Sequence, residues 1–135
     1  MQITTFNPMI VSKNAEEIIR LFEELGFERR HHKTAIDGRN ISSARMKLTN
    51  EDGKSFYVDV ASSEKVPQDL TTMRMNVRDF EEAYEFLKSR GFTNPQGGHV
   101  VESPSSKSCL MLSPSGFSIQ LTQHIKNNDE SGVNI

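Results

Sequence analysis

The sequence NAEEIIRLFEELGF, from Asn14 to Phe27, occurs a second time in diverged form as DFEEAYEFLKSRGF, from Asp79 to Phe92. The two stretches align without a gap when Asn14 is paired with Asp79, an offset of 65 residues. Each stretch begins with a residue type that favours a helix N-cap, continues with two glutamates and ends in Gly-Phe. Because these features recur in register, the chain is predicted to consist of two diverged copies of one module.

The spacing of apolar residues predicts an amphipathic helix within each copy. Gly26 and Gly91 lie where the left-handed residue after a helix end is expected. The predicted apolar helix face pairs residues across the repeat as follows: Ile18, Ile19, Leu21 and Phe22 with Ala83, Tyr84, Phe86 and Leu87.

A strand is predicted before each helix and three strands after it, so that the order β-α-β-β-β occurs twice. Asp37-Gly38, Asn50–Gly53 and Pro114–Gly116 are the predicted hairpin turns. The predicted strands are Thr5–Ser12, Glu28–Thr34, Ile41–Leu48 and Ser55–Ala61, then Thr71–Val77, His99–Glu102, Ser108–Leu112 and Phe117–Gln123.

The predicted fold class is α+β, with two tandem βαβββ modules forming a curled mixed sheet around a concave groove. We predict a single domain over residues 1–125, comprising module one (1–61), a linker (62–69) and module two (70–125). The polar tail, residues 126–135, is predicted to be disordered.

Alternation along the strands assigns each side chain to a face. The following side chains are predicted to face the helices: Phe56, Val58 and Val60; Met73, Met75 and Val77; Phe117, Ile119 and Leu121. The opposite, more polar face of each module is called the open face here. It is predicted to carry Asn7, Met9, Val11, Tyr57 and Asp59 in module one, and Thr72, Arg74, Asn76, Ser118, Gln120 and Thr122 in module two.

The first repeat, with its preceding VSK, and the closing segment SPSGFSIQLTQ resemble motifs of the vicinal oxygen chelate superfamily, which includes glyoxalase I, extradiol dioxygenases and bleomycin resistance proteins. The resemblance covers about Met1–Ile125 and implies the glyoxalase/bleomycin resistance fold. It also implies a homodimer. Because this fold hosts many chemistries, it does not fix the activity.

Metal-dependent members of the superfamily carry a His seven residues before each helix cap and a Glu on each closing strand. The matching positions here are Asn7, Thr72, Asp59 and Gln120. One carboxylate with two amides and a hydroxyl is a poor set of transition-metal ligands, so no metal and no other cofactor is predicted.

Two arginines are predicted on the open face. Arg74 is interpreted either as an anchor for an anionic ligand or as the ion-pair partner of Asp59. Arg45 is interpreted as a solvated strand residue, with a second basic cavity residue as the alternative. Tyr57 is expected either to stack on a ligand or to pack in the sheet.

The cysteine and the histidines are interpreted as residues without a catalytic role. Cys109 is predicted to be a buried, inert thiol because no base is placed beside it. His31, His32 and His99 are interpreted as surface or rim residues, although a site combining one of the first two with His99 is conceivable. His124 is expected to face solvent.

Composition limits the class of protein. The net charge of −2 gives no sign of nucleic-acid binding, and no apolar run approaches the length of a membrane span. A single cysteine and an N-terminus without signal-peptide character predict a cytoplasmic protein.

The first functional hypothesis is a metal-free binding protein that holds a small polar or anionic organic molecule. Its predicted contacts are Asn7, Met9, Tyr57, Asp59, Thr72, Arg74 and Gln120. The alternative is a divalent-metal-dependent lyase, isomerase or dioxygenase with non-standard ligands, in which Asp59 is the strongest ligand candidate. A third hypothesis is a structural or regulatory module whose groove is closed by its own side chains.

Overall fold

The computed structural model describes residues 1–33 and 43–125, without the side chains of residues 31–33. It contains two compact units. Among the described residues, the N-terminal unit comprises 7–33 and 43–71, and the C-terminal unit combines 1–6 with 72–125. The first strand therefore contributes its beginning to one unit and its remainder to the other.

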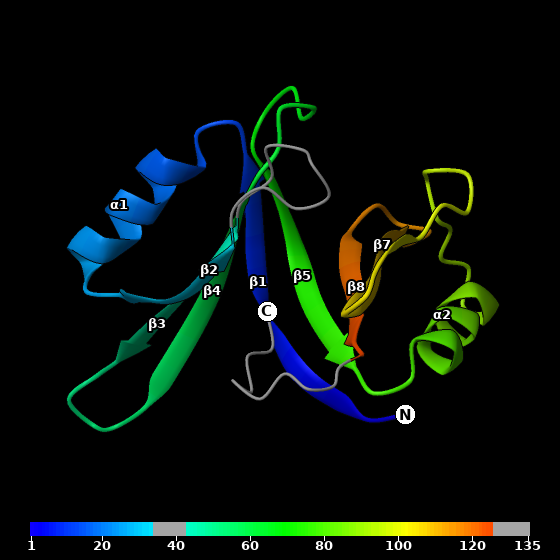
Figure 1. Cartoon of the computed structure of the whole chain (residues 1–135), viewed down its shortest axis with the longest axis horizontal. Helices are drawn as coiled ribbons and strands as arrows, with labels where there is room; N and C mark the ends of the chain where they lie inside the picture. The colour runs from blue at the N-terminus through cyan, green and yellow to red at the C-terminus, as the bar shows by residue number, and fades with distance from the viewer. Residues whose placement is uncertain (34–42, 126–135) are drawn as a thin grey trace. The chain divides into compact units, whose positions relative to one another are not determined.

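The order of elements is βαβββ, repeated once (Figure 1). The first copy contains β1 (Ile3–Ser12), α1 (Ala15–Leu25), β2 (Glu28–Lys33), β3 (Ser43–Thr49) and β4 (Ser55–Ser62). The second contains β5 (Leu70–Val77), α2 (Phe80–Ser89), β6 (Val101–Ser103), β7 (Ser106–Leu112) and β8 (Ser118–His124).

The strands of the two units follow the same pairing scheme. In the N-terminal unit the strand order is β2-β3-β4-β1, with β1 parallel to β4 and the other pairs antiparallel. In the C-terminal unit the beginning of β1 is followed by β5-β8-β7-β6, with β5 parallel to β8. The predicted mixed sheet of an α+β protein with two βαβββ copies is confirmed.

The strand registers extend the 65-residue repeat beyond the helices. Met9 is the parallel partner of Asp59, and its repeat equivalent Arg74 is the parallel partner of Gln120. Asp59 and Gln120 therefore occupy equivalent positions. Across the neighbouring strands, Asp59 lies opposite Arg45 and Gln120 lies opposite Leu110.

Both helices end in the same way. The amides of Phe27 and Phe92 donate to carbonyl oxygens five residues earlier, at 2.9 and 3.0 Å. Gly26 has φ 113° and Gly91 has φ 92°, values that strain any residue with a Cβ atom. The sequence prediction of two left-handed glycines after the helices is thus confirmed.

The helix beginnings differ. Asp79 caps α2, since its Oδ1 accepts from the amide of Glu82 at 3.1 Å. Asn14 occupies the N-cap of α1 without a capping bond from its side chain. Instead, its backbone amide donates to the hydroxyl of Ser12 at 2.9 Å.

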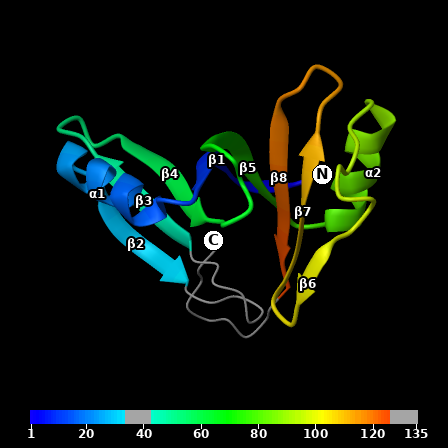
Figure 2. The same ribbon diagram turned by 90° about the horizontal axis from the view of Figure 1, so that it is seen from above.

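Each helix packs on one face of its own strands to form a core. Figure 1 shows α1 beside β2, β3 and β4, and Figure 2 shows α2 beside β7 and β8. The core of the N-terminal unit contains Ala15, Ile19, Ala44, Met46, Val58 and Val60. The core of the C-terminal unit contains Met75, Val77, Phe80, Ala83, Leu87, Cys109, Met111, Ile119 and Leu121.

Four predicted core side chains are instead exposed, in two equivalent pairs. Leu21 on α1 and Phe86 on α2 are 52% and 42% exposed. At 100° per residue, position 21 lies almost opposite position 19, so the predicted face was too wide. Phe56 and Phe117 are 47% and 56% exposed; Phe56 is the second residue of β4, and Phe117 immediately precedes β8.

At the ends that lie within the described residues, the predicted strands differ from the structure by no more than two residues. The Asp37-Gly38 turn and the tail at 126–135 lie outside the described residues. Within the described ranges, neither helix has the length and apolar character that a bilayer crossing requires. The single-domain assignment, with its module boundaries and linker, and the shared concave groove stay predictions.

Candidate functional site

The open face of the N-terminal unit carries a polar cluster centred on Asp59. Asp59 is fully buried in the middle of β4. Its Oδ2 accepts from the amide nitrogen Nδ2 of Asn7 at 3.0 Å, and its Oδ1 lies 3.4 Å from Nε of Arg45. The carboxylate is therefore held by a cation and an amide from two other strands.

Arg45 closes this cluster. Its Nη2 donates to Oδ1 of Asn7 at 2.8 Å, so that Asn7, Arg45 and Asp59 contact one another. The Arg45 side chain is 12% exposed. The interpretation of Arg45 as a solvated strand residue is therefore wrong, because pairing with Asp59 offsets the cost of burying its charge.

Tyr57 and Met9 flank the cluster. Tyr57 is 38% exposed, and its ring lies under two cations, with the Arg45 Cζ at 5.1 Å and the Lys47 Nζ at 5.8 Å from its centroid. These cation–π contacts orient the ring while one part stays open to solvent. Met9 is buried beside Asp59 in the parallel pair.

The open face of the C-terminal unit carries hydroxyl and amide groups together with the guanidinium of Arg74. Thr72 is buried, and its Oγ1 accepts from the Ser118 hydroxyl at 2.8 Å. Arg74 is 6% exposed, and its Nε donates to Oδ1 of Asn76 at 3.2 Å. Gln120 is half-buried in register with Arg74. An ion pair between Arg74 and Asp59 stays a prediction.

These residues do not fit the metal site that the resemblance implies. Asp59 is the only carboxylate at the four positions, and its oxygens already contact Arg45 and Asn7. A metal ion at Asp59 would either lie against the Arg45 guanidinium or displace it. The first case adds repulsion between two buried positive charges, and the second breaks the Arg45–Asp59 ion pair. Among the described residues, no three His, Cys, Asp or Glu side chains lie close enough to hold a metal ion.

Cys109 lies in the core of the C-terminal unit and is 3% exposed. Burial raises the pKa of the Cys109 thiol to about 11. The thiolate is therefore rare at neutral pH. The prediction that Cys109 is buried is confirmed.

The structure describes the side chains of two of the four histidines, His99 and His124. His99 is exposed, as predicted. The side chains of His31 and His32 lie outside the described residues, and so does any site combining them with His99. His124 is half-buried as the last residue of β8, so the expectation that it faces solvent is wrong.

His124 belongs to a hollow that the sequence analysis did not detect. Its volume is about 330 Å³, and its described lining residues are Thr4, Val77, Arg78 and His124. All four belong to the C-terminal unit. Asn76 and Thr122 were predicted on the open face, and Arg78 and His124 follow them by two residues along the chain. Strand alternation therefore predicts the same face for Arg78 and His124.

Comparison with known proteins gives matches in structure only. No protein-family model and no curated protein matches the sequence. A methylmalonyl-CoA epimerase from Streptomyces coelicolor, in complex with 2-nitronate-propionyl-CoA, is 13% identical with a TM-score of 0.58, covering 93% of this chain and 99% of that one.

Two further solved structures are similar. A glyoxalase/bleomycin resistance protein/dioxygenase superfamily member from Vibrio splendidus is 15% identical, with a TM-score of 0.52 over 88% of this chain and 97% of that one. A hypothetical protein from Bacillus halodurans is 10% identical, with a TM-score of 0.63 over 94% and 100%. At these identities the likeness establishes the fold alone, and the chain has the glyoxalase/bleomycin resistance fold.

Proposed function

We propose that this protein binds a small polar or anionic organic molecule without using a metal ion. The proposed contacts are open-face residues of both units: Asn7, Met9, Tyr57 and Asp59, and Thr72, Arg74 and Gln120. No catalytic residue is assigned, because the proposed role requires only recognition.

The observation that carries the proposal is the ion pair between Asp59 and Arg45. The 3.4 Å contact places a guanidinium where a metal ion would need to approach the carboxylate. The same contact leaves the cluster close to electrically neutral, while Asn7 fixes the orientation of both charged groups. A pre-oriented polar cluster beside a partly exposed aromatic ring is the kind of lining that ligand pockets use.

The structural neighbours support a small-molecule role in general terms. The Streptomyces coelicolor epimerase of the same fold is in complex with 2-nitronate-propionyl-CoA. That complex illustrates that this fold accommodates an organic ligand, and the ligand of the present chain is proposed only by chemical class.

Metal analysis tests the metal-free part of the proposal. Protein purified without chelator is expected to contain well under one Ni, Fe, Mn or Zn per chain by mass spectrometry. A metal ion present at one per chain after dialysis would contradict the proposal and favour the metal-dependent lyase, isomerase or dioxygenase alternative.

Thermal unfolding tests the binding part, because a ligand that binds only the folded state raises Tm in a concentration-dependent way. Small carboxylic acids and organic phosphates are the probes. At least one probe is expected to raise Tm in the wild type and to lose that effect in Tyr57→Ala. If no probe raises Tm, or Tyr57→Ala responds equally, small-ligand binding at the open face is contradicted.

The assembly and location proposed with this function are a homodimer in the cytoplasm, with no nucleic-acid or membrane partner. Light scattering after size-exclusion chromatography measures the mass. A value near twice the 15.3 kDa of one chain is expected, and a mass of one chain contradicts the dimer.

A further inference from the structure

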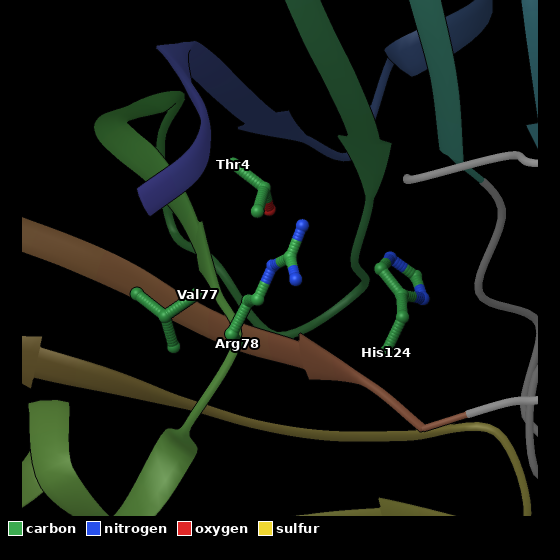
Figure 3. Close-up of a pocket in the computed structure, with 4 residues that line it drawn as sticks. All are labelled: Thr4, Val77, Arg78 and His124. Carbon is green, nitrogen blue, oxygen red and sulfur yellow. The ribbon is translucent and has the colours of Figure 1, made fainter. Parts of the chain in front are cut away.

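The hollow at the end of β5 and β8 contains an arginine whose side chain is available to a ligand. Arg78 is exposed, and among residues 1–33 and 43–125 its guanidinium has no hydrogen-bond or ion-pair partner. Figure 3 shows the guanidinium extending toward Thr4, with the His124 imidazole on the other side of the space.

The position of Arg78 is fixed although its side chain is exposed. Its backbone amide donates to the carbonyl oxygen of Gln2 at 3.1 Å, and it lies between Val77 and the helix cap Asp79. Val77 and Phe80 are 3% and 2% exposed in the core. The backbone at Arg78 is thus held in place, so a ligand needs to order only the Arg78 side chain.

The neighbouring carboxylates are directed elsewhere. Asp79 accepts from the amide of Glu82, and the carboxylate of Glu82 lies 3.4 Å from the N-terminal amine. Neither provides the lining of the hollow. The formal charge that Arg78 brings to the space is therefore not cancelled by these two acids.

Thr4 and His124 add groups that complement an oxyanion. The Thr4 hydroxyl makes only a long bond of 3.3 Å to the carbonyl oxygen of Asn76, so it can rotate to donate to a ligand. His124 contributes an imidazole to the lining on the other side of the hollow (Figure 3). Arginine pairs with carboxylate and phosphate through two parallel N–H bonds.

We propose that this hollow is an anion-binding site that receives the carboxylate or phosphate group of a small organic molecule. Arg78 forms the charge-assisted bonds, and Thr4 and His124 complete the polar lining. At about 330 Å³, the hollow falls within the size range of small-ligand pockets and exceeds what the anionic group alone needs. The site lies outside the seven residues of the proposed function, so either proposal can fail alone.

The test uses three probes that share a phenyl ring: phenyl phosphate, benzoate and the neutral benzamide. Binding is followed by NMR through the Val77 methyl groups and the Thr4 amide, at constant ionic strength. We expect saturable shifts with at least one anion and none with benzamide. Tighter binding of phenyl phosphate assigns a phosphate site, and tighter binding of benzoate assigns a carboxylate site.

Arg78→Gln is expected to weaken the preferred anion about tenfold, the loss of one charge-assisted interaction at an exposed position. Arg20→Gln, which removes the same charge from exposed α1, is expected to change Kd less than about twofold. The proposal is overturned if benzamide binds equally, if neither anion shifts Val77, or if Arg78→Gln binds like the wild type. Shifts at Asn7 and Tyr57 report the open-face cluster separately and leave this conclusion unaffected.

Discussion

The two units share a packing scheme but differ in the chemistry of their open faces. Met46 and Met111 are repeat equivalents, and both are fully buried between helix and sheet. The equivalent open-face positions carry Asn7, Arg45 and Asp59 in one unit and Thr72, Leu110 and Gln120 in the other. The comparison indicates that the residues facing the helices determine the shared packing, whereas the open-face residues differ between the units without changing that packing.

The largest expected effect tests the equivalence of the two cores. Met46→Ala and Met111→Ala are each expected to lower the free energy of unfolding by about 2–5 kcal/mol, because each leaves a cavity in a closed core. Urea denaturation measures both.

Met46→Leu and Met111→Leu serve as controls, since they nearly preserve volume and are expected to cost less than about 1.5 kcal/mol. If one alanine variant is as stable as the wild type, the two cores are not equivalent.

The next effect tests the difference between the open faces. Asp59→Asn is expected to destabilise by about 3 kcal/mol, because it leaves the Arg45 guanidinium largely buried without its carboxylate. Gln120→Ala, at the equivalent position, is expected to cost less than about 1 kcal/mol, because no buried charge loses its partner.

A double variant sharpens this result. Arg45→Leu combined with Asp59→Gln gives the N-terminal unit the residues of the C-terminal unit at both positions. It is expected to be more stable than Asp59→Asn, because the Arg45 charge is removed together with the carboxylate that it contacts. A double variant less stable than Asp59→Asn would contradict the role of the ion pair.

The smallest effect tests the helix beginnings. Asp79→Ala is expected to cost about 1 kcal/mol through loss of the bond to the Glu82 amide. Asn14→Ala is expected to cost less than about 0.5 kcal/mol, because its side chain makes no capping bond.

Thermal or urea unfolding distinguishes the two caps, and Asp79→Asn is the matched control because asparagine also caps helices well. Equal losses for Asn14→Ala and Asp79→Ala would show that the beginnings of α1 and α2 do not differ as the structure indicates.

Much of the fold was predictable from the sequence. The cap, acidic turn and glycine of each helix are local signals, and their recurrence at 65 residues located both helices. Strand character and turn residues located the strands to within two residues at their described ends. Alternation then assigned Val58, Val60, Ile119 and Leu121 to the cores correctly. The prediction was wrong at Leu21 and Phe86, because the apolar residues of each helix are spread over too wide an arc to define which side faces the sheet.

The candidate site was predictable only in part. The sequence placed Asn7 and Asp59 on one face, since that follows from strand parity within each strand. It assigned Arg45 to solvent, and it did not detect the hollow with Arg78 and His124.

What the sequence determined by itself was the repeated module, its element order and the faces of its strands, because these depend on residues a few positions apart. What only the tertiary structure decided was the choice of partners. Asp59 contacts Asn7 across 52 residues, and Arg45 contacts Asn7 across 38. Such contacts depend on which strands become neighbours and on side-chain reach, and no local pattern encodes either property.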